Sequence, residues 1–143
     1  MRTLLRLLPI AVSLLLSACN RAPDEQRIRE AVTAMEAAVE ARNPRDFMVH
    51  VADDFVGRDS GFDRTSLHNL LRAQFLRNQA VGVVIGPIDV VLQPPRATAR
   101  MSVTLSGSTG GLLPERGAIY SVETGWKLVD GQWRCLSASW EQR

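Results

Sequence analysis

The residues WKLVDGQWRC, from Trp126 to Cys135, restrict the possible folds more than any other stretch of this sequence. Asp130-Gly131 separates two runs in which apolar and polar side chains alternate. Both residues tolerate the positive φ of a two-residue type I′ turn, so we predict a β-hairpin centred on this dipeptide. The turn also fixes the register. The predicted pairs are Val129 with Gln132, Leu128 with Trp133, Trp126 with Cys135, Thr124 with Ser137 and Val122 with Ser139.

The first half of the chain has the hydrophobic spacing of helices. Apolar residues recur every three or four positions in several segments, which is typical of amphipathic helices with one face inward. Asp24, Asn43 and Asp63 precede these segments and are suitable N-caps. The predicted helices run from Asp24 to about Arg42, from Pro44 to about Ala52, and from the cap Asp63 to about Arg77.

From Ala80 onward the hydrophobic period changes to two. Apolar residues alternate with polar ones from Ala97 to Leu105, which predicts a strand with one solvated face. Before it, residues 81–85 and 88–92 read as a strand that is interrupted at Gly86-Pro87. Helices followed by strands predict a two-layer α+β domain.

The N-terminal segment has the order of an export signal. Arg2 and Arg6 precede an apolar stretch that ends at Ala18 and is shorter than the roughly 20 residues a membrane-spanning helix needs. Its end, Leu16-Ser17-Ala18-Cys19, resembles the bacterial lipobox, which implies cleavage before Cys19 and lipidation of that cysteine. A triacylated cysteine anchors a chain to a membrane without any protein span. We therefore expect a signal peptide (1–18), a lipidated tether (19–23) and one domain (24–143).

Location and charge narrow the possible partners. Asn20 follows the lipobox cysteine, and we expect the outer membrane, facing the periplasm, in preference to the inner membrane. Removal of residues 1–18 takes away Arg2 and Arg6, which leaves 15 basic residues against 15 acidic ones. A domain without basic excess is poorly suited to nucleic acid. The membrane, through the lipid, is the expected partner.

The order of motifs resembles the nuclear transport factor 2-like superfamily, which includes steroid isomerases and SnoaL-type cyclases. The matching features are a helix, Asn-Pro, a second helix, Ala52-Asp53-Asp54-Phe55, a third helix, and strands that end in GWKLVDGQWRCLSASW. The resemblance covers residues 24–141. It implies a cone-shaped α+β domain in which three N-terminal helices pack on a curved antiparallel sheet around a pocket. It also implies a homodimer that forms through the open side of the sheet.

The same resemblance nominates Asp59 as a catalytic base. In the steroid isomerases the base follows the second helix after an ADD motif, and Asp59 stands at that position here. The acidic donors that would hold an enolate are missing, because residues 24–42 contain no tyrosine and the inner face from Ala97 to Leu105 is apolar. We therefore interpret Asp59 as a solvated loop residue and keep it as a candidate for an enzyme alternative.

Two further residues belong to that alternative. His50 and Asp54 are four positions apart, so on a continuous helix they could meet as a base and its orienting acid. The simpler interpretation is a histidine at a helix end near carboxylates. Cys135 is the one thiol besides Cys19, and we interpret it as a buried structural thiol. Two histidines and one free cysteine assemble no metal site of the usual spacing, and we expect no metal or cofactor.

The remaining site hypothesis is an apolar cavity. Its expected lining residues are Met101, Tyr120, Trp126, Trp133 and Cys135. In a small domain the same residues can simply fill the core. Our leading hypothesis is a lipid-anchored, non-catalytic envelope domain that binds a small apolar ligand or an envelope protein. The alternative is a small isomerase, cyclase or dehydratase that uses a pocket carboxylate.

Overall fold

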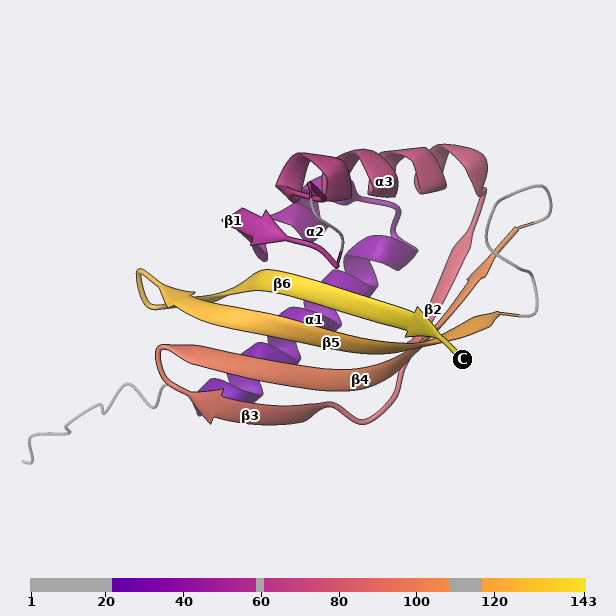
Figure 1. Ribbon diagram of the computed structural model, residues 1–143. Helices are drawn as coiled ribbons and strands as arrows, with labels where there is room; N and C mark the ends of the chain where they lie inside the picture. Colours follow the sequence, from indigo (N-terminus) through magenta and orange to yellow (C-terminus); the bar gives the residue numbers. More distant parts are fainter. Residues whose placement is uncertain (1–21, 59–60, 109–116) are drawn as a thin grey trace, which may run out of the picture.

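The computed structural model describes residues 22–58, 61–108 and 117–143. Helices come first in these ranges and strands dominate the second half, as the change of period predicts (Figure 1). The helices are α1 (Asp24–Glu40), α2 (Pro44–Met48) and α3 (Arg64–Arg77). The strands are β1 (Val51–Val56), β2 (Val81–Ile85), β3 (Asp89–Gln93), β4 (Arg96–Gly107), β5 (Ala118–Val129) and β6 (Gln132–Gln142).

The strands form one curved, mixed sheet. Its order is β1-β6-β5-β4-β2, and β3 pairs with β4 on the same side as β2. β2 and β3 pair with different ends of β4, as expected for a strand interrupted at Gly86-Pro87. The pairs among β2 to β6 are antiparallel, as expected, but β1 departs from this expectation because it lies parallel to β6 at one edge.

The helices and the sheet make two layers around one main core. In Figure 1 α1 crosses behind β4 and β5, while α3 lies along the top of the molecule. Ile28 and Val32 of α1 pack in the same buried cluster as Ala99 and Trp126 of the sheet. The predicted α+β cone is therefore confirmed. The described helices, strands and buried clusters all lie within residues 22–143.

Two of the three predicted helix caps are confirmed. The Asn43 side chain accepts a hydrogen bond from the backbone N–H of Asp46 at 3.2 Å, and Asp63 accepts from that of Ser66 at 2.8 Å. Such caps satisfy N–H groups that have no partner inside the helix. Asp24 is not a cap but the first helical residue. Its carboxylate instead accepts a hydrogen bond from the indole N–H of Trp133, at 3.0 Å.

The second helix is shorter than predicted. It ends at Met48, and the segment expected to complete it, through Ala52, instead enters strand β1. Val51, Ala52 and Phe55 bury their side chains against the domain core. The backbone N–H of Cys135 also donates to the carbonyl of His50 at 2.8 Å, which ties this segment to β6. Tertiary packing therefore overrides the local helical pattern here.

The hairpin turn has the predicted type, and its register holds for the first half of the strands. Asp130 and Gly131 have φ values of 49° and 75°. The predicted pairing holds as far as Trp126 with Cys135. Beyond it, a bulge at Leu136 shifts the register by one residue. The pairs observed there are Gly125 with Ser137, Thr124 with Ala138, and Val122 with Trp140.

The bulge changes which side chains of β6 face the helices. In the predicted register Ser137 and Ser139 would point inward, whereas in the structure Ala138 and Trp140 do so. Gly125 suits this arrangement, because a Cβ atom there would lie 2.4 Å from the hydroxyl oxygen of Ser137. The inner face of β6 is therefore apolar.

Candidate functional site: an apolar cavity between the helices and the sheet

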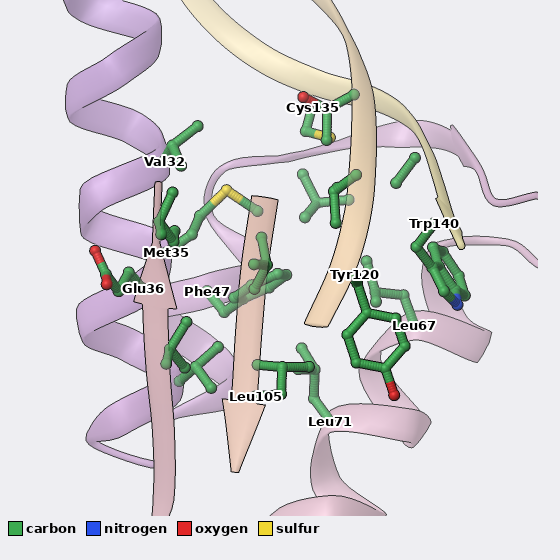
Figure 2. A pocket seen from close by; sticks show the side chains of 18 of the residues that line it. Val32, Met35, Glu36, Phe47, Leu67, Leu71, Leu105, Tyr120, Cys135 and Trp140 are labelled. Carbon is green, nitrogen blue, oxygen red and sulfur yellow. The ribbon is translucent and has the colours of Figure 1, made fainter. Parts of the chain in front are cut away.

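A cavity of about 370 Å³ lies between the helices and the inner face of the sheet (Figure 2). On the helical side it is lined by Val32 of α1 and by Leu67 and Leu71 of α3, which are inward-facing positions of each helix. The sheet contributes inward-facing residues of β2, β4, β5 and β6, among them Leu105 and Trp140. The same alternation that buries one face of the sheet therefore also builds the wall of the cavity.

Few polar groups belong to the lining. Among the described residues they include Glu36, Gln74, Tyr120 and Thr124. In Figure 2 the carboxylate of Glu36 and the hydroxyl of Tyr120 both point away from the middle of the cavity, on opposite sides. The Thr124 hydroxyl already accepts a hydrogen bond from the indole N–H of Trp126 at 2.8 Å. The interior is thus suited to an apolar molecule.

The cavity reaches the surface beside α3. Leu70 lines it and is 40% exposed, so this leucine lies at the opening. Leu67 and Leu71, from the same helix, lie deeper and are half-buried. A ligand that enters beside Leu70 would therefore pass along the inner face of α3.

The structure places four of the five sequence-derived pocket residues at the cavity. Met101, Tyr120, Trp126 and Cys135 line it. Trp133 does not, because its indole lies against the first turn of α1, where it donates to Asp24. Trp133 instead borders a separate polar groove beside the hairpin turn.

Sequence reasoning missed other residues that line the cavity. The predicted pair of Val122 with Ser139 would put Trp140 on the outer face of β6, because the hydrophobic alternation gives no sign of the bulge at Leu136. Leu67 and Leu71 lie four residues apart on the inward side of α3 and also line the cavity. Their helical spacing is the signal that could have identified them.

The thiol of Cys135 faces the cavity but has the properties of a structural group. The residue is only 2% exposed, and its Sγ donates a weak hydrogen bond to the carbonyl of Ser137 at 3.4 Å. Burial raises the pKa of this thiol to about 12. Because the thiolate is the nucleophilic form, Cys135 is not an activated nucleophile.

His50 and Asp54 do not form the pair that a continuous helix would allow. His50 lies in the turn after α2, and Asp54 lies on the extended strand β1, where four residues span about 13 Å. Asp54 forms an ion pair with Lys127 at 2.6 Å, and its hydrogen bond with Lys127 is the largest cause of its lowered pKa. Burial, and then the positive charge of Arg134, lower the pKa of His50. His50 borders the polar groove and not the cavity.

Two of the sequence-derived candidates, Asp59 and Cys19, lie outside the described residues. Within residues 22–58, 61–108 and 117–143, no three His, Cys, Asp or Glu side chains gather closely enough to hold a metal ion. Over the same ranges, none of the helices is long and apolar enough to cross a bilayer.

No family model matches the sequence, and no curated protein matches it. Solved structures do match the fold. Bd1075 of Bdellovibrio bacteriovorus has a TM-score of 0.72 at 9% identity, over 82% of this chain and 41% of that one. This chain thus spans less than half the length of Bd1075.

This chain covers most of the length of two other similar structures. One is a candidate scytalone dehydratase from Novosphingobium aromaticivorans, with a TM-score of 0.70 and 12% identity over 83% of each chain. The other is a nuclear transport factor 2-like protein from Cytophaga hutchinsonii, with a TM-score of 0.71 and 14% identity over 85% of this chain and 99% of that one. The chain therefore has the cystatin-like cone fold of the nuclear transport factor 2-like proteins.

Proposed function

We propose that this protein is a lipid-anchored domain of the cell envelope that binds a small apolar ligand without acting on it chemically. The observation that carries the proposal is the cavity of about 370 Å³ between α1, α3 and the sheet. Its volume lies in the range of small-molecule sites, which is about 300–1,000 Å³. An apolar cavity of about 150 Å³ is already large enough for benzene, so this one accommodates roughly two rings or a bent hydrocarbon chain.

The close packing of protein interiors supports a binding role for this space. Small domains normally fill their core with side chains and leave few voids larger than a water molecule. Here the inward-facing residues of β4 include Met101 and Val103, yet the cavity remains beside them. A ligand that contacts these walls would restore the missing van der Waals contacts.

The arrangement of polar groups supports binding without catalysis. Glu36 is the only carboxylate among the described lining residues, and it points away from the middle of the cavity. Acid–base chemistry needs a titratable group within hydrogen-bond reach of the reacting atom. His50 and Asp54 lie elsewhere, and the thiol of Cys135 has a strongly raised pKa.

The proposed location rests on the N-terminal sequence. Cleavage before Cys19 and lipidation of this residue would anchor the chain by acyl groups, facing the periplasm from the outer membrane. Helix α1 begins at Asp24, so the expected tether of residues 19–23 is short. A short tether would keep the domain close to the membrane surface.

A homodimer through the outer face of the sheet is a further proposal. Val84, Val91 and Ile119 are 66%, 44% and 48% exposed on strands of that face. A second copy could cover them and remove apolar surface from water. Light scattering at high protein concentration should give twice the mass of one chain, and a monomer would contradict the proposal.

A dehydratase or isomerase is the second candidate function. Val51 and Phe55 of β1 line the cavity, and Asp59 follows the end of this strand by three residues. The candidate scytalone dehydratase among the similar structures supports this reading only through its fold. If a substrate is found, Asp59→Asn should abolish turnover in the enzyme reading. Unchanged turnover would remove Asp59 from the mechanism.

Binding can be tested with N-phenyl-1-naphthylamine, a neutral apolar dye whose fluorescence rises in dry sites. Val103→Trp places a large ring in the cavity, whereas Val84→Trp makes the same change at an exposed position of the sheet. We expect Val103→Trp to weaken dye binding at least tenfold and Val84→Trp to leave it unchanged. Circular dichroism checks that both variants are folded. Equal dye binding by the two folded variants would contradict the proposal.

A further inference from the structure

Helix α3 has an unusual charge distribution for a domain with balanced charge. Its sequence, RTSLHNLLRAQFLR, contains three arginines and no acidic residue. The acidic side chains that the described structure places in contact with it, Asp53 and Asp63, both lie at its N-terminal end. The C-terminal half of α3 therefore carries the uncompensated positive charge.

A fourth arginine lies at this end of the helix. The guanidinium of Arg42 donates to the backbone carbonyls of Phe75 and Asn78, at 3.2 and 2.9 Å. It thus lies beside the last turn of α3, together with Arg77. Carbonyl oxygens accept these hydrogen bonds without neutralising the charge, so Arg42 adds to the positive surface.

The middle and the C-terminal end of α3 expose leucine side chains. Leu76 is 85% exposed, the most exposed of the large apolar side chains in the described ranges, and Leu70 is 40% exposed. Arg72 precedes Leu76 by four residues, so these two side chains share the outer side of α3. Leu70 and Arg77 are seven residues apart and share a second side, about a third of a turn from Leu76. In Figure 1 α3 forms the top of the molecule, with no other element above it.

We propose that the C-terminal half of α3 docks on the surface of an anionic lipid bilayer. Exposed leucines flanked by arginines are typical of helices that lie in the membrane interface, where arginines meet lipid phosphates and leucines enter the acyl region. The surface consists of Leu70, Arg72, Leu76, Arg77 and Arg42.

Docking in this way would connect the bilayer to the cavity. Leu70 belongs both to the docking surface and to the opening of the cavity, so an acyl chain could pass from the membrane along α3. This step rests on the proposed ligand-binding function and extends it, because it names a lipid-derived hydrocarbon as the ligand class. Docking itself does not depend on what the cavity holds.

The test uses a chain of residues 20–143, which contains every described helix, strand and buried cluster. Its binding is measured by cosedimentation with two kinds of vesicle, one of phosphatidylethanolamine with phosphatidylglycerol and one of phosphatidylcholine alone. We expect binding to the first and little to the second. Arg72→Gln and Arg77→Gln should each weaken binding about fivefold, because one arginine near an anionic surface contributes about 1 kcal/mol.

The leucine variants separate insertion into the acyl region from electrostatic attraction to the lipid headgroups. Leu76→Ser should weaken vesicle binding about tenfold, because a leucine that leaves water is strongly favoured by the acyl region. Leu76→Trp should bind and shift its emission to shorter wavelength on contact with vesicles. The controls are Arg45→Gln on α2 and Val56→Ser on β1, both exposed elsewhere, and they should bind as the parent does.

Three results would overturn the docking proposal. The first is that the parent chain does not bind anionic vesicles. The second is that the α3 variants and the control variants bind these vesicles equally well. The third is that binding depends on the arginines but is unaffected by Leu76→Ser. The last result would indicate electrostatic attraction to the lipid headgroups without entry of a leucine into the acyl region. None of these outcomes bears on the cavity itself, because Arg72, Leu76 and Arg77 do not line it. Binding of the naphthylamine dye by the same variants therefore tests the proposed function separately.

Discussion

Val122 on β5 pairs with Trp140 on β6, one residue further along the chain than the Ser139 of an unbroken hairpin. The indole of Trp140 consequently lines the cavity. It also meets the ring of Phe62 edge to face, with centroids 5.8 Å apart and an interplanar angle of 71°. A single extra residue at Leu136 thus decides whether the inner wall of the cavity is aromatic or polar.

Removing this indole should destabilise the domain. Trp140→Ala should lower the free energy of unfolding by about 2 kcal/mol, less than for a fully buried tryptophan because the side chain is only half-buried. Ser139→Ala is the matched control on the outer face and should change stability by no more than about 0.5 kcal/mol. Urea denaturation measures both. Equal losses in the two variants would contradict the bulged register.

Acid should weaken the fold through His50. Burial and the charge of Arg134 lower the pKa of this imidazole in the folded protein, so the folded state favours the neutral ring. The pKa of His50 in the folded protein lies below its unfolded value of about 6.5. Above pH 6.5 the ring is neutral in both states, and the domain keeps its full stability. As the pH falls below 6.5 toward the folded pKa, the unfolded state binds the proton more readily, and the domain loses stability.

The variant His50→Gln should have a shallower loss of stability between pH 6.5 and 5, because the titrating ring is gone. His68→Gln removes the other histidine of the chain but keeps His50. The part of the stability loss that His50 causes should therefore persist in this variant. Thermal unfolding across this pH range measures the slopes. An identical slope in the parent and His50→Gln would show that His50 does not govern the acid response.

The thiol of Cys135 should react only when the domain opens. With a pKa of about 12 it is almost entirely protonated at pH 8, whereas an unfolded cysteine is substantially ionised. We expect Ellman's reagent to label the chain of residues 20–143, which lacks Cys19, at least about a thousandfold more slowly in the native state than in guanidinium. Rapid labelling of native protein would mean that the thiol is accessible and ionised.

Lipidation is predicted for Cys19 alone. In a bacterial host that processes lipoproteins, metabolic labelling with an alkyne-tagged fatty acid should mark the parent chain. It should also mark Cys135→Ser but not Cys19→Ser. Lipobox recognition depends on the cysteine at the cleavage position, which explains the expected difference. Label on Cys19→Ser, or an unlabelled parent chain, would contradict the lipoprotein proposal.

Local signals in the sequence were sufficient for most of the fold. Asp63 caps α3 because its short carboxylate reaches the N–H of Ser66, and this needs no distant contact. Asp130-Gly131 likewise determines its own turn through positive φ. The alternation from Ala97 to Leu105 places β4 correctly because a strand with one buried face has a period of two.

Features that depend on distant contacts were not predictable in this way. Asp24 matches a helix cap by position, but the indole of Trp133, far along the chain, binds its carboxylate. Val51 and Ala52 fit a helical pattern, yet pairing with β6 and burial make them a strand. The bulge at Leu136 leaves no mark on the alternation that precedes it.

The cavity is the least predictable feature for the same reason. Met101, Tyr120 and Trp126 could equally have filled a core, because the volume left between α1, α3 and the sheet depends on how the layers are spaced. Residue type alone does not determine that spacing. The pocket was therefore a hypothesis at the level of sequence and has a definite lining only in the structure.

Native mass spectrometry of the protein purified from its own host tests the central claim most directly. The account predicts a retained apolar molecule, small enough for a cavity of about 370 Å³ and absent from a Val103→Trp variant purified in the same way. Its release on unfolding would allow chemical identification. A parent protein that carries no ligand, and that binds the naphthylamine dye no better than Val103→Trp, would contradict the account.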